Sequence, residues 1–203
     1  MEETELVRRA QSGDFDAFTE LINAHKAQIY GLALKLSGNE QDAEDIVQDT
    51  FLRAIDKIDQ FRLESAFGTW LYRIALNQAR ALFNKRRQGE LGPIEDYLPP
   101  GHELSAGDPS LSARLALYDW KDPEKLFEAE ELRTTIDRLI AELPYLYREA
   151  FVLRYIEELP VKEVAESIGE SEAATKSRIL RARLALREQL ARIFEDRHER
   201  KMP

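Results

Sequence analysis

Apolar residues recur at intervals of three and four along both ends of this chain of 203 residues, which is typical of helices with one buried face. In the N-terminal part, Ser37-Gly38 is a favourable helix stop, and Asn39 can cap a following helix whose first turn is acidic. No stretch shows the convincing period-two alternation of a strand. The pattern predicts a helical bundle with helices over residues 18–36, 39–58 and about 69–87. The inner stripe expected for the second helix is Ala43, Ile46, Val47, Thr50, Ala54 and Ile58.

The C-terminal part predicts four helices joined by short turns. Proline is tolerated in the first turn of a helix, so Pro123, Pro144 and Pro160 can each open one. Gly169 is expected to break the third helix and Ser171 to cap a long last one. The predicted fold class is all-α, with two helical domains at residues 1–87 and 124–203.

The segment between these parts predicts a long linker. Residues 88–110 contain four of the eight prolines and four of the nine glycines, so they cannot sustain a regular element. Residues 88–131 also carry a net charge of −8, against −9 for the whole chain. We interpret 88–123 as an acidic linker between domains, with a disordered surface insertion as the alternative. Both readings exclude this segment from the core.

The composition is that of a soluble globular protein, with 43% hydrophobic and 33% charged residues. No apolar run approaches the roughly 18–20 residues that cross a bilayer. The N-terminus has no basic start followed by an apolar stretch, so we expect no secretory signal. The absence of cysteine excludes disulfides and thiolate metal sites and fits a reducing compartment. We therefore expect a cytoplasmic protein that does not insert into membranes.

Residues 160–187 have the arrangement of a helix-turn-helix: a short helix, a turn containing Gly169, and a longer basic helix. Ala165 is expected where the two helices cross closely, and Gly169 where the turn needs a positive φ. The residues expected to lock the pair together are Ile168, Thr175 and Ile179.

The second helix of this pair carries a net charge of +4 over residues 171–187. Lys176 and Arg178 lie early enough to reach a major groove, whereas Arg181 and Arg183 fall where phosphates would be met. An ordinary amphipathic helix with a solvated basic face is the alternative. Because the alanine, glycine and capping serine occur in register with the basic helix, we predict DNA binding.

Residues 67–87 combine aromatic residues with five positive charges and no acidic residue. Such a helix surface can stack on bases and bind phosphates, at roughly 1–3 kcal/mol for each stacked base. The alternative is that Trp70 and Tyr72 are ordinary core aromatics, and the spacing alone does not decide between the two. The residues expected on this aromatic and polar face of the helix are Trp70, Arg73, Asn77, Arg80 and Asn84.

The sequence gives little support to catalysis. Its three histidines are scattered, and it has no HExxH motif, glycine-rich phosphate loop, GxSxG motif or cysteine nucleophile. An acidic cluster that includes Asp42, Asp45 and Asp49 could suggest a metal site. These three residues are expected on one exposed helix face without a converging partner, so a solvated or partner-binding face is the better interpretation. We expect no enzyme activity, metal, cofactor or small-molecule substrate.

A resemblance to a known family adds to this reading. The motifs that carry it are DAEDIVQDTFLRAI, WLYRIALNQARALFNKRR, LPYLYREAFVLRYIEELPVKEVAESIG and TKSRILRAR, in this order. They resemble bacterial RNA polymerase sigma factors, and more narrowly the extracytoplasmic-function (ECF) group, over about residues 12–87 and 124–190. The resemblance implies a factor that binds core RNA polymerase and directs initiation through −35 recognition and −10 melting. It also implies promoter DNA and an anti-sigma factor as partners.

The resemblance assigns three sets of site residues, and it places the loop DQFRLESAFG where the group captures a flipped base. The core-polymerase set is Asp45, Gln48, Asp49, Phe51 and Arg53. The −10 set is Arg62, Trp70, Arg73, Asn77, Arg80, Lys85, Arg86 and Arg87. The −35 set is Ser171, Glu172, Ala174, Lys176, Ser177, Arg178, Arg181 and Arg183.

A helix-turn-helix transcription regulator that never joins the polymerase is the alternative function. Its N-terminal bundle would be a sensor or a dimerisation unit, and it predicts a stable dimer and a palindromic site. Against this alternative, the sequence suggests no ligand pocket. A plain regulator would also leave the aromatic and basic helix at residues 67–87 without a role.

Overall fold

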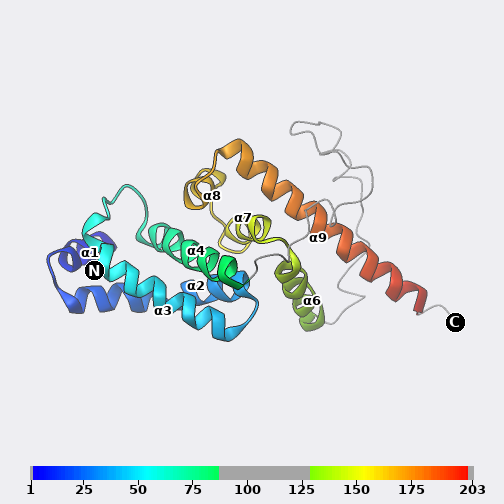
Figure 1. Ribbon diagram of the computed structural model, residues 1–203, viewed down its shortest axis with the longest axis horizontal. Coiled ribbons are helices and arrows are strands. Elements are labelled where there is room, and N and C mark those ends of the chain that lie inside the picture. Colours follow the sequence, from blue (N-terminus) through cyan, green and yellow to red (C-terminus); the bar gives the residue numbers. More distant parts are fainter. Residues whose placement is uncertain (1, 87–128, 201–203) are drawn as a thin grey trace.

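The computed structural model describes residues 2–86 and 129–200, which form two groups of helices (Figure 1). The first group is α1 (Glu3–Gln11), α2 (Phe15–Ser37), α3 (Glu40–Lys57), the 3-10 turn η1 (Ile58–Gln60) and α4 (Phe67–Arg86). The second group is α6 (Ala129–Glu142), α7 (Tyr145–Tyr155), α8 (Val161–Ile168) and α9 (Glu172–Arg200). No strand occurs in these two ranges, and the predicted all-α fold with two helical domains is confirmed. The predicted linker and its boundaries lie outside the described residues.

The N-terminal helices end and begin where the capping residues predicted. Gly38 adopts φ 78° at the end of α2, and its N–H donates to the Leu34 carbonyl at 2.8 Å. The Asn39 side chain accepts from the backbone N–H of Asp42 at 2.9 Å, which caps α3. The helix expected from near Thr69 begins two residues earlier, at Phe67.

The short helix α1 was not predicted, because only a few apolar residues in its nine positions repeat at helical spacing. Its Gln11 side chain contacts the segment between α3 and α4. The amide of this side chain donates to the carbonyls of Ile58 at 3.0 Å and Phe61 at 2.7 Å. α1 thereby holds the segment that connects α3 to α4.

The core of the first group lies between α2, α3 and α4. All six residues of the stripe predicted for α3 are buried. The apolar face of α4 is also buried at Leu71, Ile74 and Ala75. Burying one large aliphatic side chain contributes about 1.5–3 kcal/mol, so this core fixes the direction of the opposite, polar face of α4.

The second group packs α7 against α9, with α8 in contact with both helices. Pro144 precedes α7 and Pro160 precedes α8, as predicted from helix-opening prolines. Pro123 lies outside the described residues.

The two groups of helices are in contact at two places. α4 lies against α8, and α2 lies against α6 and α7 (Figure 1). No helix within the described ranges has both the length and the hydropathy that crossing a bilayer requires.

Candidate DNA and polymerase interfaces

The helices α8 and α9 form the predicted helix-turn-helix. Gly169 adopts φ 75° between them, and Ala165 is 4% exposed where they cross. The Ser171 hydroxyl accepts from the backbone N–H of Ala174 at 3.2 Å and caps α9. The residues predicted to lock the pair, Ile168, Thr175 and Ile179, are all buried.

The first turns of α9 present polar groups to solvent. Ser171, Glu172 and Lys176 are exposed, and Ala174 and Ser177 are partly exposed. The Lys176 ammonium lies 3.7 Å from the Glu172 carboxylate, in an exposed pair that is worth at most about 1 kcal/mol. This end of α9 therefore has the exposure that entry into a DNA groove requires.

Arg178 is placed differently from its neighbours on α9. Its side chain is only 20% exposed, and Nη2 donates to Glu170 Oε1 at 2.5 Å. Nη1 lies 3.7 Å from Oε1 of Glu149, a buried residue of α7. In this conformation Arg178 is bound to carboxylates of the protein rather than presented to DNA.

The two arginines predicted to meet phosphates are not brought together. Arg183 is exposed, and its guanidinium lies 5.9 Å from the centre of the Tyr155 ring. Arg181 is partly buried, and its position two residues earlier places it on a different face of α9.

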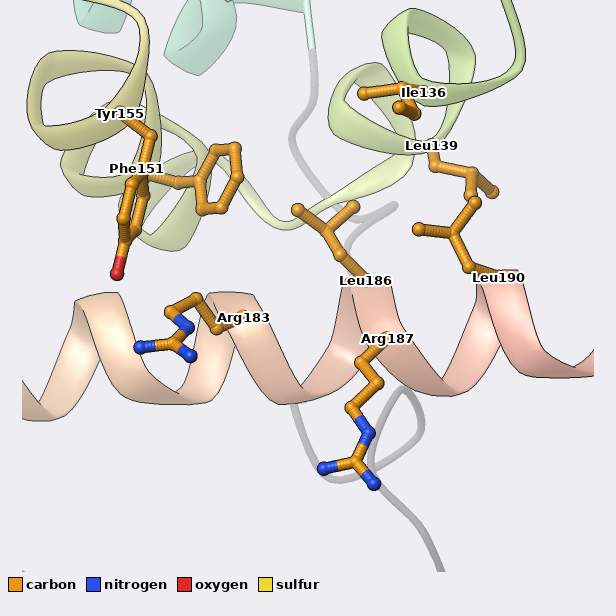
Figure 2. A pocket seen from close by; sticks show the side chains of 8 residues that line it. All are labelled: Ile136, Leu139, Phe151, Tyr155, Arg183, Leu186, Arg187 and Leu190. Carbon is orange, nitrogen blue, oxygen red and sulfur yellow. The ribbon is translucent and has the colours of Figure 1, made fainter. Parts of the chain in front are cut away.

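A groove that the sequence did not reveal lies beside Arg183. It encloses about 390 Å³ between α6, α7 and α9 (Figure 2). Its lining residues are Ile136, Leu139, Phe151, Tyr155, Arg183, Leu186, Arg187 and Leu190. Figure 2 shows Leu186 pointing toward α6 and α7, with Arg187 pointing away from them. The groove therefore has an apolar floor and a basic margin.

Trp70 and Tyr72 of α4 lie in different environments. Tyr72 is 2% exposed and donates its hydroxyl to Glu157 Oε2 at 2.5 Å, so it belongs to the packed interior. Trp70 is partly exposed, and its ring centre lies 5.2 Å from that of Phe61 and 5.4 Å from that of Phe67. The core interpretation is correct for Tyr72, whereas Trp70 combines aromatic packing with partial exposure.

Two arginines of the −10 set contact the C-terminal helices. Arg73 Nε donates to the Glu166 carbonyl at 3.1 Å. Arg80 donates through Nε and Nη2 to the two carboxylate oxygens of Glu149, at 2.9 and 2.8 Å, and through Nη2 to the Ile168 carbonyl at 3.0 Å. Burial raises the pKa of the Glu149 carboxyl, and the Arg80 guanidinium opposes that shift.

Most of the described −10 set is exposed, including Arg73 despite its contact with the Glu166 carbonyl. Arg62, Asn77 and Lys85 are exposed. The side chain of Arg86 and the whole of Arg87 lie outside the described residues. The loop before α4 exposes Leu63, which adopts φ 57° and is 38% exposed. A positive φ is uncommon for a residue other than glycine, so this loop is held in an unusual backbone conformation.

The polymerase set follows the outer face of α3. Asp45, Gln48, Asp49 and Arg53 are exposed, and Phe51 is partly buried. Sequence reasoning missed two apolar residues on this surface, Leu52 at 55% and Ile55 at 38% exposure. Leu52 and Ile55 lie seven residues after Asp45 and Gln48, so helical spacing places them on the same face of α3 as these two residues. This spacing could have identified them from the sequence.

The prediction that Asp42 shares this exposed face was wrong. Asp42 is 6% exposed and accepts from the Asn39 amide at 2.8 Å, because it belongs to the cap of α3. No group of three or more potential metal ligands occurs in the part of the chain that the structure describes.

Known proteins resemble this chain over most of its length. Residues 21–88 match the family Sigma-70 region 2, and residues 133–186 match Sigma-70, region 4. The ECF RNA polymerase sigma factor SigW of Bacillus subtilis (strain 168) is 35% identical over 184 residues, which is 91% of this chain and 94% of that protein. The RNA polymerase sigma-H factor of Pseudomonas aeruginosa is 34% identical over 185 residues, covering 91% and 92%.

Solved structures resemble the fold. The structure of CnrH in complex with the cytosolic domain of CnrY matches with a TM-score of 0.62 and 28% identity, covering 92% of this chain and 95% of that one. The sigma factor RpoE from Bartonella quintana, solved with the anti-sigma factor NepR, has a TM-score of 0.59 and 23% identity, covering 86% and 96%. No catalytic family is indicated by these matches. The chain belongs to the family of ECF RNA polymerase sigma factors, which are DNA-binding initiation factors.

Proposed function

We propose that this protein binds core RNA polymerase and directs it to promoters by reading the −35 element and melting the −10 element. The observation that carries the proposal is the helix-turn-helix of α8 and α9, whose buried residues fix the pair while the first turns of α9 remain exposed. Residues 1–87 would form the unit for polymerase and the −10 element, and residues 124–203 the unit for the −35 element, with 88–123 linking them.

The −35 set would read duplex DNA through the first turns of α9. Exposed Ser171, Glu172 and Lys176 stand where a recognition helix meets base edges. For Arg178 to read a base, its guanidinium must first leave Glu170. The proposal therefore requires a rearrangement of this side chain on DNA binding.

The −10 set would act on separated strands. Trp70 is partly exposed and Asn77 and Arg62 are exposed, and aromatic rings and amides can contact unpaired bases. The loop that contains Arg62 is anchored by Gln11, so its position is fixed before DNA arrives. A prepositioned pocket can offset the few kcal/mol that unstacking a base requires.

The experiment that tests the function is transcription with purified bacterial core RNA polymerase. The protein is added to the polymerase with fragmented DNA from its own source, and the 5′ ends of the transcripts are mapped. Discrete starts that share two upstream motifs about two helical turns apart support the proposal. No specific starts, while another sigma factor remains active with the same polymerase, favour the regulator that acts without joining the polymerase.

Replacing Leu52 and Ile55 together by serine is expected to weaken binding to core polymerase by about tenfold or more. Both side chains are exposed apolar groups within the polar polymerase set, so their loss removes contact area from the surface without opening the core. Affinity is measured by fluorescence anisotropy of the labelled protein. Phe15→Ser removes another exposed apolar side chain, from the start of α2, and is expected to bind normally. Equal affinities of the double variant and wild type would exclude this surface.

Arg178→Ala is expected to relax the −35 sequence preference, at about 1–3 kcal/mol of discrimination at the affected position. Arg183→Ala, in contrast, should weaken binding uniformly across sequences and lower the slope of log affinity against log salt by about one. Competition binding of the assembled holoenzyme to variant promoters separates the two effects. A uniform loss for Arg178→Ala would reassign it to phosphate contact or to folding.

The remaining expectations follow from this function. A factor that acts on RNA polymerase would work in the cytoplasm, would need no metal or cofactor and would catalyse no reaction itself. We also propose that an anti-sigma factor controls it, since CnrH, which is 28% identical, has been solved in complex with the cytosolic domain of CnrY.

A further inference from the structure

His25 of α2 contacts both α1 and the first turn of α4. Its Nε2 lies 2.7 Å from Glu3 Oε1 of α1. On α4, the ring lies edge-to-face with Phe67, with 5.5 Å between the ring centres. The His25 side chain is only 14% exposed, and its Nδ1 has no hydrogen-bond partner among the described residues. The orientation of the ring therefore depends on Glu3 and on packing against α4.

Gly68 lets the His25 ring approach α4 closely. A Cβ at position 68 would lie 3.2 Å from Cε1 and 3.3 Å from Nδ1 of the ring, which is tighter than ordinary van der Waals contact. Glycine inside a helix is less favourable than alanine, and Gly68 does not have the positive φ that would require it. The missing side chain thus makes room for His25.

Phe67 links the His25 ring to the loop of residues 61–66, which precedes α4. Phe67 is 1% exposed, and its ring centre lies 5.6 Å from that of Phe61 and 5.4 Å from that of Trp70. Phe61 begins the loop, and Trp70 is the partly exposed aromatic residue of the proposed −10 surface. Close-packed interiors transmit displacements, so a shift of the His25 ring would move the aromatic groups at both ends of this loop.

α1 holds the same loop at its other end. Gln11, in the last turn of α1, donates to the carbonyls of Ile58 and Phe61. Glu3, in the first turn, contacts His25. One short helix is therefore connected to the beginning of the loop directly and to its end through His25. All of these contacts lie within the N-terminal group of helices.

We infer, building on the proposed function, that His25 is a positioning residue for −10 melting, which holds Trp70 and the loop of residues 61–66 in the arrangement that receives an unpaired base. It acts through Phe67 and Gly68 rather than by contact with DNA. A site that is ordered before its ligand arrives avoids the cost of ordering on binding. Displacing the ring should therefore impair strand separation, while polymerase binding, which is assigned to the outer face of α3, is unaffected.

Gly68→Ala displaces the ring without altering it, because the added methyl group requires His25 to move by a few tenths of an ångström. Open complexes on a duplex promoter, formed with core polymerase and measured by permanganate reactivity, are expected to fall by about fivefold. Fluorescence anisotropy should show unchanged binding to polymerase. Gly31→Ala is the matched control and should leave melting unchanged, since a Cβ on this glycine of α2 meets no other group within 4 Å.

Variants of His25 decide whether the effect passes through this ring. His25→Ala is expected to reduce open complexes by at least as much as Gly68→Ala. Adding Gly68→Ala to it should cause little further loss, since the ring that the methyl group displaces is gone. His25→Phe keeps an aromatic edge against Phe67 and should melt promoters better than His25→Ala. An equal loss from Gly68→Ala in both backgrounds would overturn the inference, as would equal melting by Gly68→Ala and wild type.

A template already melted across the −10 element separates positioning from folding. On this template the defects of Gly68→Ala and His25→Ala should shrink, because strand separation is no longer required. Undiminished defects would assign His25 to folding alone and refute the inference. If the wild-type protein forms no open complex with polymerase, the proposed function fails and the inference falls with it. Failure of the expected variant effects beside an active wild type refutes the inference alone.

Discussion

Arg148→Met is expected to lower the free energy of unfolding by about 3–5 kcal/mol. Arg148 is 1% exposed, and its guanidinium donates to the carbonyls of Leu36 at 2.5 Å, of Leu143 at 2.9 Å and of Ala141. These carbonyls belong to the C-terminal ends of α2 and α6 and to the residue after α6, where a helix dipole favours a cation. Methionine fills similar volume but leaves buried carbonyls without their donor.

Chemical denaturation followed by circular dichroism measures this loss. Arg138→Met is the matched control, because Arg138 is exposed on α6 and its pair with Glu142 is worth at most about 1 kcal/mol. Arg148→Lys keeps the charge but cannot reach three carbonyls with a planar fork, so it should fall between the two. A change within about 1 kcal/mol for Arg148→Met would show that solvent or neighbouring groups satisfy these carbonyls.

The role of Arg148 illustrates what the sequence could not supply. It was visible only as one charge in a helix, because nothing local indicates that Leu36, far away in the chain, provides an acceptor. The same holds for Glu149 and Arg80, which lie 69 positions apart. Contacts between domains depend on how the helices dock, and periodicity carries no information about docking.

Local structure, in contrast, was accessible. Gly38 and Gly169 adopt the positive φ that helix ends need, and the Asn39 and Ser171 side chains cap the helices after them. These features depend on residues within a few positions of one another. The misplacement of Asp42 shows the limit of this reasoning, because a carboxylate in a first turn can turn back to the cap rather than face solvent.

The sequence predicted which helices carry the candidate sites, but not the exposure and contacts of their side chains. The resemblance identified α3, α4 and α9 as the elements of interest, yet Leu52 and Ile55 stood out only when their exposure was known. Similarly, helical spacing placed Arg73 and Arg80 on one face of α4, and only the structure revealed that both are held by the C-terminal helices. Exposure and docking together decide which residues of a motif are available to DNA.

Trp70→Ala is expected to leave binding to core polymerase intact and to reduce open complexes on duplex promoters by at least about tenfold. Trp70 is partly exposed, and its ring contacts Phe61 in the loop that is proposed to receive a flipped base. One stacked base is worth about 1–3 kcal/mol. Permanganate reactivity of unpaired thymines measures melting, and anisotropy measures polymerase binding. On a template already melted across the −10 element the defect should become smaller, because the protein no longer has to offset unstacking.

Loss of packing is the competing explanation for such a defect, since Trp70 also contacts Phe61 and Phe67. Phe67→Leu provides the comparison: Phe67 is 1% exposed, so its replacement weakens the same aromatic cluster without changing a group that faces DNA. Trp70→Phe retains ring contacts and should melt promoters better than Trp70→Ala. If Phe67→Leu loses melting as completely as Trp70→Ala at a similar loss of unfolding free energy, the tryptophan acts by supporting the loop. If only the Trp70 variant fails on duplex DNA and recovers on the melted template, its ring participates in strand separation.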